Sequence, residues 1–96
     1  MRDIQLKTVD LVQDGKKTPI SYKNQLAAIM RTPTRDTADI EEIRKSVRIL
    51  NELDKVEGDV LRLEDADFEY VCQRVKSARW PIIDAVILAF VEDVTS

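Results

Sequence analysis

Residues 4–12 alternate apolar and polar positions, with one slip of phase between Leu6 and Val9. Strict alternation is typical of a β-strand with one buried face. Asp14-Gly15 follows this segment, and Asp-Gly is a strong signal for a two-residue hairpin turn because glycine accepts a positive φ. The pattern therefore predicts a short N-terminal β-hairpin.

The position of the turn also predicts the register of the hairpin. A two-residue loop places Gln13 opposite Lys16 and Val9 opposite Ile20. Pro19 lies in the return strand and has no N–H to donate to a β-ladder. We therefore expect a short return strand at a sheet edge.

A helix is predicted over residues 22–30. Ser21 is suited to cap it by accepting a hydrogen bond from a free backbone N–H near Asn24. Pro33 forces the residue before it out of the helical region, so the helix must end there. Its apolar stripe consists of Leu26, Ile29 and Met30.

The next helix is predicted over residues 37–55, with Asp36 or Thr37 as its cap and Gly58 beyond its end. Acidic residues at its start and a lysine near its end complement the helix dipole. Apolar residues repeat at intervals of three and four, which predicts one buried stripe. The members of this stripe are Ile40, Ile43, Val47, Leu50 and Leu53.

A brief extended piece at 60–63 precedes a third helix that begins at Glu64 or Asp65. The extended piece either pairs with the hairpin or packs beneath it, and the sequence leaves both open. Leu63 and Phe68 are spaced to form a hydrophobic staple around the helix start. The inward residues are predicted to be Phe68, Val71, Cys72 and Val75, with Arg74, Lys76 and Arg79 in the last turns.

A fourth helix is predicted from Pro81 to Val94, since proline suits the first helical position. Asp84 is expected to interact with free N–H groups at the helix start. This helix is apolar almost all round, which indicates either the centre of the core or one side of a protein interface. Large apolar and aromatic side chains anchor interfaces. The candidate contact residues are Trp80, Ile83, Ile87 and Phe90.

These elements predict a single α-rich α+β domain over residues 1–96, with the hairpin packed against about four helices. Hydrophobic residues make up 44% and charged residues 34% of the chain, as in a globular domain. No apolar stretch approaches the ~20 residues of a membrane span. One cysteine cannot form an internal disulfide, which favours a reducing compartment. We expect a cytoplasmic location.

The residue inventory argues against an enzyme. Histidine is absent, which removes the usual general base and metal ligand, and two glycines are too few for a phosphate-binding loop. Around Gly58 the acidic residues resemble a calcium loop, but Leu53 and Lys55 occupy two ligand positions. Cys72 lies on an apolar stripe, as a structural cysteine does. We expect no cofactor, metal ion or small-molecule substrate.

Nucleic-acid binding is the alternative class of function. The net charge of −3 argues against it, but residues 1–50 carry ten basic and seven acidic side chains, whereas residues 51–96 carry five and eleven. A basic N-terminal surface is therefore the candidate for a small nucleic-acid-binding regulator. Its members are Lys16, Lys17, Lys23, Arg31 and Arg35.

Several dispersed positions carry a likeness to a known group of proteins. They are the opening Ile4-Gln5-Leu6-Lys7, Asp14-Gly15, Leu26 before Pro33, Ile40-Glu41-Glu42-Ile43-Arg44 and Leu61-Arg62-Leu63-Glu64-Asp65. In these positions the chain resembles small accessory proteins encoded by tailed bacteriophages and prophages. The resemblance implies a part in tail or particle assembly, in the bacterial host cell or in the virion. We therefore expect a non-enzymatic protein that binds another protein or a second copy of itself.

Overall fold

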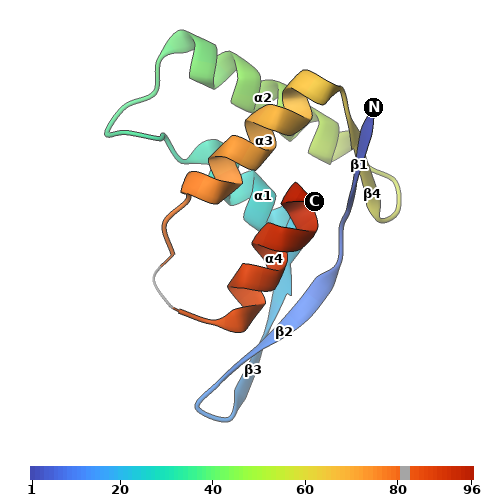
Figure 1. Cartoon of the computed structure of the whole chain (residues 1–96), viewed down its shortest axis with the longest axis vertical. Helices are drawn as coiled ribbons and strands as arrows, with labels where there is room; N and C mark the ends of the chain where they lie inside the picture. The colour runs from blue at the N-terminus through green and yellow to red at the C-terminus, as the bar shows by residue number, and fades with distance from the viewer. Residues whose placement is uncertain (81–82) are drawn as a thin grey trace.

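The computed structural model describes residues 1–80 and 83–96, in which four helices pack with two small antiparallel sheets (Figure 1). This confirms the α-rich α+β class. The strands are β1 (Arg2–Gln5), β2 (Thr8–Gln13), β3 (Lys16–Ser21) and β4 (Val60–Leu63). The helices are α1 (Tyr22–Arg31), α2 (Ile40–Lys55), α3 (Asp65–Ser77) and α4 (Ala85–Thr95).

The predicted hairpin is present as β2 and β3, and its predicted register is confirmed, with Gln13 opposite Lys16 and Val9 opposite Ile20. Both turn residues have positive φ, 51° at Asp14 and 76° at Gly15. Two such residues match the twist of the flanking strands. The tip of the hairpin points away from α2 and α3 (Figure 1).

The extended piece at 60–63 is β4, and it pairs with β1 rather than with the hairpin. The chain passes from the first sheet to the hairpin between Leu6 and Val9, where the alternation in the sequence slips in phase. The backbone N–H of Leu6 donates to the carbonyl of Asp59, whereas the carbonyl of Lys7 accepts from Tyr22 at the start of α1. The N-terminal segment therefore contributes to two separate sheets.

The core lies where the four helices meet the sheet of β1 and β4. The expected cap of α1 is confirmed, because Ser21 Oγ accepts from the backbone N–H of Asn24 at 3.3 Å. α3 begins at Asp65, and Leu63 and Phe68 are both buried in the core, as the staple requires. The fully buried large side chains are Ile4, Tyr22, Leu26, Ile49, Leu53, Leu61, Leu63, Val71, Val75, Phe90 and Val94.

The start of α2 differs from the prediction. Its N-cap is Asp39 rather than Asp36 or Thr37, and Asp39 Oδ1 accepts from the backbone N–H of Glu42 at 2.8 Å. The Glu42 carboxylate also accepts hydrogen bonds from Thr34. These contacts keep the preceding loop non-helical up to Asp39.

The predicted buried stripe of α2 is wrong in its first half. Ile40, Ile43 and Val47 are 66%, 46% and 45% exposed, whereas Ser46, Ile49 and Leu53 are buried and Leu50 is half-buried. The helix carries apolar residues on two neighbouring stripes, so periodicity alone does not choose between them. The stripe with Ile49 and Leu53 faces the interior, and the buried Ser46 hydroxyl on it is satisfied there by Tyr70 and Arg74.

α4 is shorter than predicted. Its N-cap is Asp84, whose Oδ1 accepts from the backbone N–H of Val86 at 2.9 Å, so Asp84 interacts with the helix start as expected. The helix begins at Ala85, and the predicted start at Pro81 lies outside the described residues. Capping by Asp84 requires an extended backbone at that residue, and this explains why helix begins after it.

Arg74 is buried. The sequence pattern had grouped it with the basic residues in the last turns of α3 and not with the inward-facing residues. Its Nη1 donates to Ser46 Oγ at 3.0 Å and to Tyr70 Oη at 2.7 Å. Its Nη2 donates to the carbonyls of Ile29, at 2.7 Å, and Thr32. One side chain of α3 therefore binds the C-terminal end of α1 and the middle of α2.

We expect Arg74→Met to lower the free energy of unfolding by on the order of 3 kcal/mol, since it leaves two carbonyls and two hydroxyls without their charged donor. Urea denaturation measures the change. Arg44→Met is the control, because Arg44 is exposed and pairs with Glu41 on the surface, where such a pair contributes about 0–1 kcal/mol. Equal stability of the two variants would contradict the role of Arg74.

The two faces of α2 can be compared by truncation. Ile49→Ala is expected to lower the free energy of unfolding by about 2–5 kcal/mol because Ile49 is fully buried. Ile43→Ala is expected to lower it by about 0.5 kcal/mol or less because Ile43 is half exposed. Urea denaturation of the two variants measures both changes in the free energy of unfolding. A larger loss of stability in Ile43→Ala than in Ile49→Ala would instead support the buried stripe predicted from the sequence.

Candidate functional site

The structure gathers three of the four candidate contact residues and leaves one apart. Trp80 is half-buried and meets the ring of Phe90 edge-on, with 5.8 Å between ring centroids. Ile87 is half-buried and lines the same hollow as these two rings. Phe90 is 1% exposed and packs on Tyr22, so it belongs to the core rather than to a contact surface. Ile83 projects into solvent, away from this hollow.

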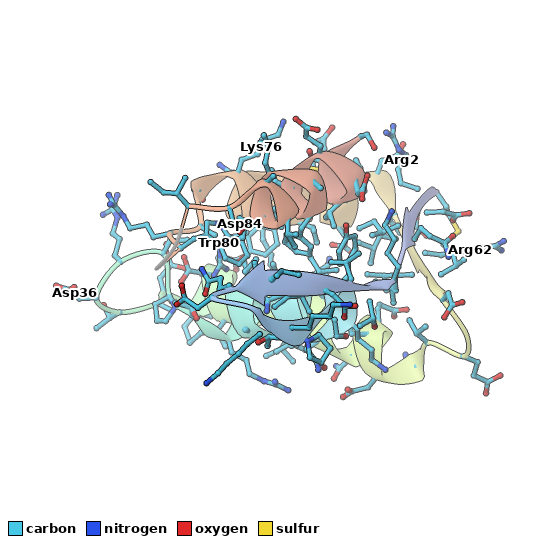
Figure 2. All side chains as sticks on the ribbon, turned by 90° about the horizontal axis from the view of Figure 1, so that it is seen from below. Arg2, Asp36, Arg62, Lys76, Trp80 and Asp84 are labelled. Carbon is cyan, nitrogen blue, oxygen red and sulfur yellow. The ribbon has the colours of Figure 1, made fainter. Side chains whose placement is uncertain are left out.

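An apolar hollow of about 180 Å³ opens between the hairpin and α4. Leu11 and Ile20 of the hairpin form one wall, and Val86 and Ile87 of α4 form the other. In Figure 2, Trp80 lies between the C-terminal helix and the hairpin. The full lining is Leu11, Ile20, Gln25, Trp80, Val86, Ile87 and Phe90.

A second, more polar hollow of about 450 Å³ adjoins the first, and the two share Gln25 and Trp80. It lies at the C-terminal ends of α1 and α3, and its basic residues are Arg74 and Arg79. Among the described residues that line it, none is acidic. The remaining lining residues are Ala28, Ile29, Thr32, Pro33, Thr34, Ser77 and Ala78. We call the two hollows together the Trp80 groove.

The ends of two helices create this groove. α1 stops at its C-cap Thr32, directly before Pro33, and α3 stops at its C-cap Ala78. Ala78 has an extended backbone (φ −66°, ψ 147°), which turns the chain away from the axis of α3 and brings Trp80 to Phe90. Arg74 holds the two helix ends at a fixed separation through its bonds to Ile29 and Thr32.

The basic residues of the alternative nucleic-acid surface are spread over several places. Lys16 and Lys17 lie at the tip of the hairpin, and Lys23 lies in the first turn of α1. Arg31 ends α1, a helix about 15 Å long, and Arg35 lies in the loop beyond it. These five residues are therefore distributed over the hairpin, α1 and the loop beyond it.

The groups that resemble catalytic or metal-binding residues do not converge. Cys72 is half-buried, and burial raises the pKa of its thiol, which favours the protonated form. Within residues 1–80 and 83–96, no three cysteine or acidic side chains come together as a metal site would require. In the same part of the chain, no helix has the length and apolarity to cross a bilayer.

One polar cluster ties the start of α1 to the end of α4. Tyr22 Oη donates to Asp93 Oδ2 at 2.8 Å, and Lys7 Nζ lies 3.0 Å from the same oxygen. Burial, together with the hydrogen bond and the negative charge of Asp93, raises the pKa of Tyr22 to about 12. The hydrogen bond from Tyr22 and the contact with Lys7 lower the pKa of Asp93.

Sequence analysis missed Arg74, Tyr22, Gln25 and Arg79 as residues of interest. The sequence did contain a signal for Arg74 and Tyr22. Tyr22 lies four residues before Leu26 and extends the apolar stripe of α1, and Arg74 lies three residues after Val71 on the buried face of α3. The other two line the groove only because separate helices meet there, and the sequence carries no sign of that meeting.

The raised pKa of Tyr22 has a definite consequence at alkaline pH. Between pH 10 and 12 the unfolded chain releases the phenol proton while the folded chain retains it, so stability falls as pH rises. We expect the free energy of unfolding of the native chain to fall by on the order of 2 kcal/mol over this range, and that of Tyr22→Phe to fall much less. Urea denaturation at a series of pH values measures both. Parallel stability curves for the two chains would contradict the assignment.

Comparisons of the chain with protein-family models, with curated proteins and with solved structures find no match.

Proposed function

We propose that this chain is a non-enzymatic protein-binding module that receives a segment of another protein in the Trp80 groove. The observation that carries the proposal is the apolar hollow beside Trp80 and Ile87. It opens at the surface of a small domain and is walled by the hairpin on one side and α4 on the other. Aromatic and large aliphatic side chains in such concave positions are the usual anchors of protein interfaces.

The size of the apolar hollow favours one side chain of a peptide segment over a whole small-molecule ligand. Pockets for small molecules commonly measure about 300–1,000 Å³ and enclose most of the ligand. The apolar hollow is smaller, about 180 Å³, and suits a single large side chain. Burying one such side chain contributes about 1.5–3 kcal/mol, so a useful affinity requires further contacts in the adjoining polar hollow.

The resemblance to accessory proteins of tailed phages supports a role in tail or particle assembly, in the host cytoplasm or on the virion. The residues that carry the resemblance fall at the end of β1, at the hairpin turn, in α1, at the start of α2 and at the junction of β4 and α3. These are positions that build the fold. We therefore propose that related phage proteins share the scaffold and that the partner is a neighbouring assembly component.

Selection of displayed random peptides on the folded chain tests the proposal. The selected peptides are then titrated while the fluorescence of Trp80, the one tryptophan of the chain, is recorded. We expect Ile87→Asp and Ile20→Asp each to weaken binding at least tenfold, because each places a charge in a wall of the apolar hollow. Two variants on separate elements guard against a local folding defect in one of them.

Leu88→Asp is the matched control. Leu88 is the next residue on α4, it is 60% exposed, and it does not line the groove. Circular dichroism confirms that all three variants remain folded. Peptides that bind the Ile87 and Ile20 variants as tightly as the native chain, or a selection that yields no binding peptide, would refute the proposed function.

A further inference from the structure

We infer that the segment bound in the Trp80 groove is acidic as well as apolar, with a carboxylate that pairs with Arg79 and a large apolar side chain that enters the hollow at Ile87. This inference rests on the proposed function and specifies the chemistry of the partner. The groove offers two different surfaces side by side, and a segment that fills both must carry both kinds of group.

The first observation is the charge of the polar hollow. Arg74 and Arg79 line it, and no acidic residue in the described part of the chain does so. Neither arginine forms an ion pair with a described carboxylate, since the six ion pairs of that part involve other residues. The polar hollow is therefore positively charged, and no acidic side chain among its described lining residues neutralises that charge.

The two arginines contribute differently. The four acceptors of Arg74 are neutral hydroxyl and carbonyl groups, and the C-terminal dipole of α1 offsets part of its charge. Arg79 is exposed, follows the end of α3, and has a guanidinium suited to a bidentate bond with a carboxylate. Arg79 is thus the residue that meets the acidic group, and Arg74 supplies a fixed positive background.

Within the C-terminal half of the chain, the surrounding negative charge makes the preference selective. Residues 51–96 carry eleven acidic and five basic side chains, and two of those five line this hollow. An acidic segment is repelled by most of the C-terminal half of the chain and attracted at the groove. Complementary charge of this kind directs association and suppresses binding in other orientations.

The border between the two hollows limits the spacing of the two groups in the segment. Gln25 and Trp80 belong to both hollows, so the apolar and polar parts are immediate neighbours. An extended segment advances about 3.3 Å per residue. We therefore expect the carboxylate and the apolar anchor to lie within a few residues of each other, with the Gln25 amide available to a backbone group between them.

The selected peptides provide the test. We expect them to combine Asp or Glu with a large apolar residue a few positions away. Replacing the acidic residue by its amide should weaken binding to the native chain about five- to tenfold, and the loss should shrink at high salt. Arg79→Glu should weaken binding of the acidic peptide by a similar factor and leave its amide analogue nearly unaffected.

Lys76→Glu is the control for the change in net charge, because Lys76 is exposed on α3 and does not line the groove (Figure 2). It should leave the affinity for both peptides within about twofold. Selected peptides that need Ile87 but are neutral or basic, or an acidic preference untouched by Arg79→Glu, would overturn the inference and leave the proposed function standing. Peptides indifferent to Ile87 and Ile20 would overturn the proposed function itself.

Discussion

The buried guanidinium of Arg74 is the constraint on which the arrangement of three helices depends. Removing a cation from water costs several kcal/mol, and only a nearly complete set of hydrogen bonds offsets that cost. Arg74 obtains them from the end of α1, from Ser46 of α2 and from Tyr70 of its own helix. The helices must therefore meet at one relative position, because the planar guanidinium fork tolerates little displacement of its acceptors.

The geometry of the polar half of the groove follows from this contact. Arg74 holds the C-terminal ends of α1 and α3 apart at a fixed distance, and the polar hollow is the space between those ends. The second half of the groove depends on aromatic packing, with Tyr22, Phe90 and Trp80 in edge-to-face contact from α1 through α4 to the segment after α3. A polar contact and an aromatic series therefore position the two halves independently.

Local signals in the sequence predicted the parts of the fold that local chemistry determines. The Asp14-Gly15 turn, the Ser21 cap and the staple of Leu63 with Phe68 each depend on residues within a few positions of one another. The buried face of α2 depends instead on Tyr70 and Arg74, which lie 24 and 28 residues from Ser46. Periodicity therefore favoured the more apolar stripe. Trp80 and Ile87 were selected as candidate contact residues by residue type, but their neighbours in the groove include residues of the hairpin and α1.

The exposed stripe of α2 offers a second apolar surface, and comparison with it explains why we propose the groove rather than α2 as the binding site. Ile40, Ile43 and Val47 lie on one side of a helix, so a partner there contacts them from one direction and leaves much of each side chain in water. In the groove, the hairpin and α4 surround an incoming side chain from opposite sides. Hydrophobic stabilisation grows with the apolar area removed from water, so one residue of a partner gains more in the hollow than on the helix surface. The adjoining arginines add a directional contact, because a guanidinium fixes the orientation of a carboxylate as well as attracting it.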